Sequence, residues 1–130
     1  MKTTILTVAV FLSLTLSARA GAEEPTGSAM QQKCKQAVHD IDSGTDSPSY
    51  ASGVCIGFVS GVLESHTLWM VVDAAQKRTH PTSFCIPDEV TETQILRVFL
   101  KYLDEHPEKL HYPAVVMLIE SVRHAFPCKN

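Results

Sequence analysis

The sequence predicts an all-α protein, a small four-helix domain of two helical hairpins, each stapled by one disulfide. Apolar residues recur at three- and four-residue spacing, and little of the chain alternates with a period of two. Helix start and stop signals divide the chain into four such segments. Four cysteines follow an apparent export signal, and an even cysteine count in an exported chain indicates disulfides.

The first 20 residues have the pattern of a cleaved export signal. Lys2 supplies the positive start, an apolar stretch runs from Ile5 to Leu16, and Ala18-Arg19-Ala20 is a small-x-small cleavage site. The apolar stretch is shorter than the roughly 20 residues that a membrane span requires. We therefore expect cleavage after Ala20, which leaves one soluble, exported domain over residues 21–130.

Removal of the signal makes the protein more acidic. The whole chain has 11 Lys and Arg against 14 Asp and Glu, and losing Lys2 and Arg19 leaves nine against 14, a change of net charge from -3 to -5. Nucleic acids and anionic membranes attract basic surfaces, so we expect neither as a partner. A basic protein partner is compatible with this charge.

The first helix is predicted from Ser28, as an N-cap with Gln31 closing a capping box, to Gly44. A polar turn from Ser43 to Tyr50 follows, and Pro48 within it suits a helix entry. The apolar stripe of this helix consists of Met30, Cys34, Ala37, Val38 and Ile41.

The second helix is predicted from that turn to about Lys77, with Gly53, Gly57 and Gly61 at four-residue steps. A glycine inside a helix costs about 0.5 to 1 kcal/mol relative to alanine, so another helix backbone is expected to approach this face closely. We expect a packing groove within the chain in preference to a subunit interface. Insertion into a membrane is not expected, because the helix also carries Glu64, His66 and Asp73.

The third helix has the clearest start signal. Thr91 is the predicted N-cap, Gln94 closes its capping box, and Val90 is placed to pack against Ile95. His106-Pro107 ends the helix. Its apolar stripe consists of Ile95, Val98, Phe99, Tyr102 and Leu103.

The fourth helix is predicted to enter at Pro113 and to end at Pro127. Its apolar side is broad, which indicates a central position in the fold. This side consists of Ala114, Val115, Met117, Leu118, Ile119, Val122 and Phe126.

Four cysteines allow three pairings. In an antiparallel helical hairpin, residues face each other when they lie equally far from the turn. The midpoint between Cys34 and Cys55 is position 44.5, at Gly44, and the midpoint between Cys85 and Cys128 is position 106.5, inside the turn over residues 106–109. We therefore predict the disulfides Cys34–Cys55 and Cys85–Cys128, each worth about 2 to 4 kcal/mol.

The sequence predicts no catalytic residue, metal site or cofactor. His124 lies four residues before Cys128, as a base might lie beside a thiol, but a disulfide-bonded cysteine is not a nucleophile. His106 and His111 flank Pro107 and do not share a helix face, and no HExxH or CxxC motif is present. The isolated histidines, which could titrate but need not, are His39, His66 and His80.

The segment that joins the two hairpins is the candidate partner-binding loop. It is polar, contains a proline, and ends beside a predicted disulfide, which would lower the entropy cost of binding. The alternative is a plain connector. The candidate residues are Lys77, Arg78, Thr79, His80, Pro81, Thr82, Ser83 and Phe84.

Four segments resemble the Rap/Tai family of type VI secretion immunity proteins. They are Cys55-Ile56-Gly57-Phe58-Val59-Ser60-Gly61, Cys85-Ile86-Pro87 with Val90 and Gln94, Tyr102-Leu103-Asp104-Glu105-His106-Pro107-Glu108, and Ala125-Phe126-Pro127-Cys128. The resemblance covers most of the chain from Cys34 onward. Phe58 departs from the family, which often has tyrosine there, and this affects packing more than function.

The resemblance implies a periplasmic immunity protein without catalytic activity or cofactor, often a homodimer. Such proteins bind a peptidoglycan amidase delivered by neighbouring cells and occlude its active site, which protects the producer and its kin. The family's contact loops vary, so we expect the effector contacts in the joining loop, with His80 and Phe84 as anchors.

Two other functions fit the sequence less well. A small disulfide-bonded periplasmic acid-stress chaperone would lose its fold or dimer at low pH to expose apolar surface. A hydrolase would show turnover that depends on His124 or His80. The sequence does not identify the cognate effector.

We predict that the protein isolated from the periplasm begins at Gly21 and contains no free thiol, because both disulfides form after export. Intact-mass measurement with and without reduction, followed by peptide mapping, tests this. Unoxidised thiols at all four positions would contradict the predicted fold.

Overall fold

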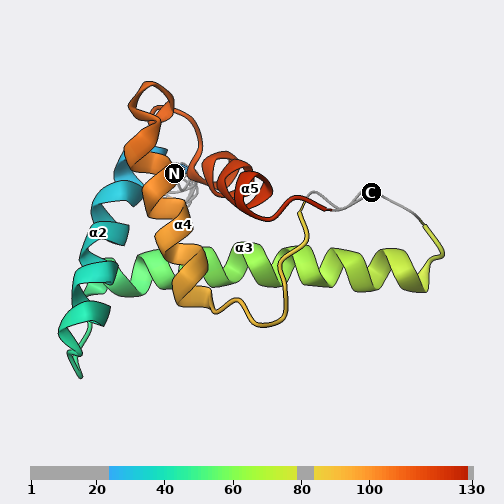
Figure 1. Cartoon of the computed structure of the whole chain (residues 1–130), viewed down its shortest axis with the longest axis horizontal. Coiled ribbons are helices and arrows are strands. Elements are labelled where there is room, and N and C mark those ends of the chain that lie inside the picture. Colours follow the sequence, from blue (N-terminus) through green and yellow to red (C-terminus); the bar gives the residue numbers. More distant parts are fainter. Residues whose placement is uncertain (1–23, 79–83, 129–130) are drawn as a thin grey trace, which may run out of the picture.

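A computed structural model describes residues 24–78 and 84–128 (Figure 1). The only β-type pairing in these ranges is an isolated bridge between Thr26 and Pro113, so the predicted all-α class is confirmed. The predicted export signal lies outside the described residues. The helices are α2 (Gly27–Ser43), α3 (Tyr50–Ala75), α4 (Glu92–Glu105), the 3-10 turn η1 (Pro107–Lys109) and α5 (Ala114–Ala125).

Helix α2 begins slightly earlier than predicted. Its N-cap is Thr26, whose hydroxyl accepts from the N–H of Ala29 at 3.3 Å. Gly27 and Ser28 donate instead to the carbonyls of Tyr112 and Leu110, both at 2.9 Å. The predicted cap at Ser28 with Gln31 is therefore wrong, because the start of α2 is bound to the segment before α5. The predicted end is confirmed, since Gly44 is the left-handed C-cap with φ 63°.

Helix α4 starts as predicted. The Thr91 hydroxyl accepts from the N–H of Gln94 at 3.3 Å, and the Gln94 side chain accepts from the N–H of Thr91 at 2.7 Å. Both bonds of the predicted capping box are thus present. This start signal is local in sequence, which explains why the prediction succeeded.

The core lies where α2, α4 and α5 meet the first half of α3. In Figure 1, α2 and α4 lie side by side and cross α3 steeply. Ile41, a predicted stripe residue, is exposed because the end of α2 extends past the core. The buried apolar residues are Met30, Cys34, Ala37, Cys55, Val59, Phe84, Ile95, Leu96, Phe99, Tyr102, Leu103, Ala114, Met117, Leu118 and Val122.

Both predicted disulfides are confirmed. Cys34–Cys55 joins α2 to α3 with a Cα–Cα distance of 5.2 Å and is fully buried. Cys85–Cys128 joins the segment before α4 to the segment after α5, with a Cα–Cα distance of 4.9 Å. The N–H of Cys85 also donates to the carbonyl of Phe126 at 3.0 Å, so backbone and sulfur bonds together close the end of the chain onto this segment.

The predicted packing groove at the glycines of α3 is wrong. A Cβ built at Gly53, Gly57 or Gly61 would meet no atom of a neighbouring segment within 4 Å. Helices α2 and α4 pack on the opposite side of α3, where its buried residues Ser52 and Cys55 lie. The glycine face is therefore open in the monomer.

The second half of α3 extends beyond the core (Figure 1). The buried residues of this helix end at Val59, although the helix continues to Ala75. By length and composition alone α3 could cross a membrane, but its first half is a core helix of this domain, tied to α2 by a disulfide. The projecting half thus contributes no fully buried residue to the core.

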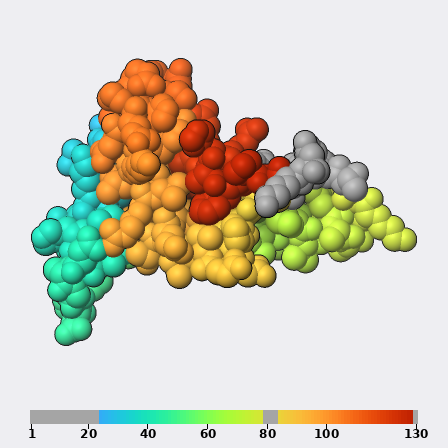
Figure 2. Space-filling model, viewed as in Figure 1, coloured from blue at the N-terminus to red at the C-terminus, as the bar shows by residue number. Residues whose placement is uncertain are grey.

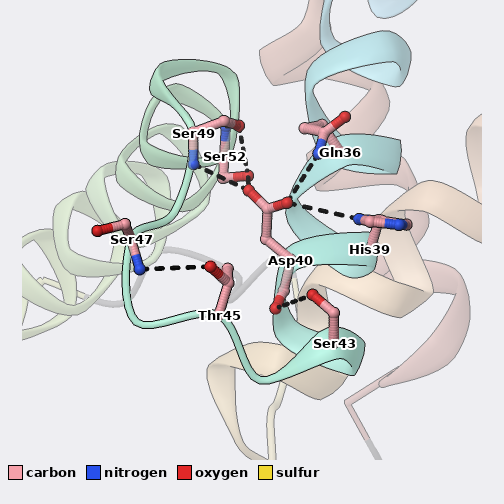
Figure 3. Close-up of polar contacts among 8 residues, drawn as sticks. All are labelled: Gln36, His39, Asp40, Ser43, Thr45, Ser47, Ser49 and Ser52. Atoms are coloured by element: carbon pink, nitrogen blue, oxygen red, sulfur yellow. Dashed lines mark hydrogen bonds and ion pairs between the residues drawn. The ribbon is translucent and has the colours of Figure 1, made fainter.

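One buried carboxylate fixes the turn between α2 and α3 (Figure 3). Asp40 accepts from the Ser52 hydroxyl at 2.5 Å, the Ser49 N–H at 2.9 Å and the Gln36 amide at 2.7 Å. These bonds, that from Ser52 above all, hold the pKa of Asp40 well below its ordinary value. The same turn is closed by Ser43, whose hydroxyl donates to the Asp40 carbonyl at 3.1 Å.

We predict that Asp40→Asn lowers the free energy of unfolding at neutral pH. A carboxylate with a depressed folded pKa stabilises the fold fully above its ordinary pKa of 3.8, and this contribution is lost as the pH falls below that value. The difference from wild type should therefore shrink towards about pH 2. Urea unfolding followed by circular dichroism measures it, with the exposed Asp46→Asn as the matched control. Equal stability of Asp40→Asn and wild type at neutral pH would refute the role of this carboxylate.

Candidate functional site: a partner-binding surface

The projecting half of α3 exposes apolar side chains on all sides. Successive helix residues turn by about 100°, so four consecutive positions surround the helix axis. The exposed positions are Leu68, Trp69, Met70 and Val71, and Trp69 is 63% exposed. The space-filling view shows this end of α3 standing clear of α4 and α5 (Figure 2). An exposed apolar patch of this kind marks an interaction surface.

An apolar groove of about 510 Å³ lies between the projecting half of α3 and α5. The α5 side is formed by Val115 and Ile119, which were predicted as core residues but are only half-buried. They line a groove because the diverging second half of α3 does not cover them. The α3 side of the groove consists of Gly57, Phe58, Gly61, Val62, Ser65, His66 and Trp69.

Phe84 also lines this groove. Its side chain is only 4% exposed, and its ring stacks on His66 with 4.0 Å between ring centroids and an interplanar angle of 22°. Partial burial lowers the pKa of His66 below its ordinary value. Phe84 therefore anchors the joining loop to α3 and, in this structure, does not present its ring to a partner.

The start of the joining loop is exposed. Lys77 has a positive φ of 53°, and the N–H of Arg78 donates to the carbonyl of Asp73 at 2.9 Å, which turns the chain at the end of α3. Both cationic side chains are accessible to a partner. The remaining predicted contacts, Thr79, His80, Pro81, Thr82 and Ser83, lie outside the described residues.

A polar cluster joins α4, η1 and α5. The Tyr102 hydroxyl donates to Glu120 at 2.7 Å, and the Lys109 ammonium donates to Tyr102 at 3.0 Å and to Glu120 at 3.2 Å. Burial raises the pKa of Tyr102, whereas the hydrogen bond from Tyr102 lowers the pKa of Glu120. His106 stacks on Tyr102 with 4.0 Å between centroids. The sequence did not reveal this cluster, because its members are far apart along the chain.

The polar cluster around Tyr102 and Glu120 has a structural role. Glu120 and Tyr102 are hydrogen-bonded to each other and to Lys109, so this cluster holds η1 and α5 in place. Cys128, the residue four after His124, is in a disulfide and is not available as a nucleophile. Over residues 24–78 and 84–128, no group of three or more His, Cys, Asp or Glu side chains could hold a metal ion.

These features define a small helical binding protein, held by two disulfides and carrying an exposed apolar helix end beside a disulfide-anchored loop. The sequence profile of Rap1a immunity proteins matches residues 26–128. The chain therefore belongs to the Rap1a immunity protein family. No curated protein and no solved structure gave a significant match. Membership indicates that the protein binds a partner effector.

We predict that acid weakens the fold as His66 gains a proton. A histidine with a lowered folded pKa takes up protons mainly after unfolding, so stability is lost as the pH falls through the ordinary pKa of 6.5. His66→Phe, which keeps a ring on Phe84, should reduce this loss. Unfolding free energies at about pH 7.5 and 5.5 test it, with the exposed His124→Phe as control. A pH dependence that is the same in His66→Phe and wild type would exclude His66 as its source.

Proposed function

We propose that this protein is a periplasmic immunity protein that binds a type VI secretion peptidoglycan amidase and blocks its active-site cleft. It thereby protects the producing cell and its kin. The family supports an immunity role. The two disulfides suit an oxidising compartment such as the periplasm, which agrees with the predicted export signal.

One observation carries the proposal: the second half of α3 is exposed and projects from a core that a disulfide ties to its first half. The end of α3 stands away from α4 and α5, as an element that enters a cleft must do (Figure 2). Phe84 and the Cys85–Cys128 disulfide fix the far end of the loop. Preorganisation of this kind lowers the entropy lost on binding.

Charge favours the encounter as well. The mature chain has a net charge of -5, which would steer a basic enzyme towards it. Lys77 and Arg78 give the end of α3 a local positive charge. These side chains would form ion pairs with acidic groups at the rim of the partner's cleft.

In this proposal the protein acts by occluding the active site of the amidase and catalyses no reaction itself. We also propose that it works as a homodimer.

We predict that Arg78→Glu combined with His80→Ala weakens binding to the cognate amidase by about tenfold or more, roughly 1.4 kcal/mol. Both changes fall on the proposed contact loop, and the Arg78 side chain is exposed. The alanine substitution at Phe84 is a poor test, because truncating a buried phenylalanine costs about 3 to 5 kcal/mol of stability. Titration calorimetry with the cognate amidase, and inhibition of its peptidoglycan cleavage, provide the two readouts.

The control is Lys101→Glu, a charge reversal on the exposed side of α4, which should bind like wild type. Unchanged affinity of the loop variant would remove the loop from the contact while leaving immunity in place. A wild-type protein that does not bind or inhibit the amidase would contradict the proposed function. Suppression of client aggregation at about pH 3 by that same protein would favour the acid-stress chaperone instead.

A further inference from the structure

The proposed effector contact lies at the end of α3 and does not use the apolar groove between α3 and α5. This groove holds about 510 Å³. On the α3 side it is lined by Gly57 and Gly61, where an added Cβ would meet no atom within 4 Å. The α5 side is formed by Val115 and Ile119, and Trp69 lies furthest along α3. Pockets of this size and apolar character bind small molecules.

We propose that this groove binds a single-chain fatty acid, with the hydrocarbon chain between α3 and α5 and the carboxylate paired with Arg123. The residues that line the groove include no acid, and His66 is the one titratable side chain among them. A matching ligand is therefore apolar over most of its length and charged at one end. This inference is independent of the proposed immunity function.

The groove has the dimensions of one extended chain. Gly57 and Trp69 are 12 positions apart on α3, which at about 1.5 Å per residue corresponds to roughly 18 Å. A volume of about 510 Å³ over this length is narrow beside an α-helix, whose diameter with side chains is about 10 to 12 Å. Gly57 and Gly61 add no side chain that would interrupt the groove. A slender, flexible chain fits this shape, whereas a helix of a protein partner is too wide to enter it.

The lining also favours a hydrocarbon over an extended peptide. Each peptide group has an N–H donor and a C=O acceptor, which need partners when they are buried. The groove offers only two polar side chains, Ser65 and His66. The Ser65 hydroxyl already donates to the carbonyl of Gly61 at 2.7 Å, and the His66 ring stacks on Phe84. A hydrocarbon chain has no polar groups to satisfy along its length.

Arg123 supplies the positive charge for the carboxylate. It follows Ile119 by four residues on α5, so it lies one turn further along nearly the same face of the helix. Side chains of a helix lean towards its N-terminus, which brings the guanidinium within reach of the turn that carries Ile119. The Arg123 side chain is exposed, and within residues 24–78 and 84–128 no hydrogen bond or ion pair holds it. A guanidinium can bind a carboxylate through two parallel N–H donors.

The acid nearest to Arg123 on α5 does not neutralise this charge. Arg123 also borders a polar hollow that contains Glu120. Glu120 pairs with the Lys109 ammonium at 3.2 Å and accepts from the Tyr102 hydroxyl at 2.7 Å. Arg123 therefore stands between an apolar groove and a hollow whose acid is already paired. This is the arrangement that an anionic amphiphile requires for its head group.

Trp69, the only tryptophan of the chain, provides an internal probe of the groove. Its side chain is 63% exposed, so a ligand that covers it should shift its fluorescence to shorter wavelengths. We expect decanoate to cause a saturable shift in the mature, oxidised protein. Octanoate should bind about tenfold more weakly, because it buries two fewer methylenes. Decyltrimethylammonium, with a chain of the same length and a positive head, should also bind about tenfold more weakly or worse.

Two matched substitutions on α3 separate the groove from the rest of the helix. Gly61→Leu fills the groove and should weaken decanoate binding about tenfold or more. Gly53→Leu adds the same side chain to the same helix outside the groove and should bind like wild type. An added Cβ meets open space at both positions, so both variants should fold, which circular dichroism and thermal melting check. Titration calorimetry gives affinities that do not depend on the surroundings of Trp69.

Arg123→Gln tests the head-group contact. It should weaken decanoate binding about tenfold and leave the binding of neutral decanol unchanged, because only decanoate carries the charge. Lys101→Gln, which removes a positive charge from the exposed side of α4, is the control and should leave both affinities unchanged.

A wild-type protein without saturable decanoate binding would overturn the proposal. Binding that Gly61→Leu does not weaken, or equal affinity for decanoate and decyltrimethylammonium, would overturn it as well. Protein that does not bind decanoate but sediments with phosphatidylglycerol vesicles would refute the fatty-acid site and assign the groove to a membrane surface. Amidase binding is a separate readout on the same variants, so the failure of either proposal leaves the other standing.

Discussion

The attachment of only the first half of α3 to the rest of the domain is the constraint on which the remaining structure depends. The Cys34–Cys55 disulfide and the packing of α2 and α4 hold this half from Ser52 to Val59. Beyond Val59 no residue of the helix is fully buried, although Phe84 still stacks on His66. A small domain can bury only a limited area, and here the core is concentrated at one end of its longest helix.

The fixed half explains why the exposed half can remain helical. Starting a helix is the unfavourable step, whereas adding residues to an existing helix is not. The anchored turns therefore serve as a nucleus for the turns that carry Leu68 and Trp69. The apolar surface that results is larger than the fold itself requires, and it supports the proposed contact with an effector at this end of α3.

The ionisable groups with shifted pKa values serve this architecture. Asp40 fixes the turn between α2 and α3, and Glu120 joins α5 to Tyr102 and Lys109. Perturbed pKa values often mark active sites, but a structural hydrogen-bond network perturbs them equally well. The family assignment agrees with a protein that acts by binding.

The sequence by itself determined the all-α class, the capping box of α4, the Gly44 C-cap and both disulfides, because each depends on local spacing or on symmetry about a short turn. It also indicated the family. Only the tertiary structure decided that the glycine face is open, that Phe84 is buried and that Asp40 and Tyr102 have distant partners. Helical periodicity shows which residues share a face, but the face that is covered depends on the direction in which the next helices cross, and no local signal encodes that direction.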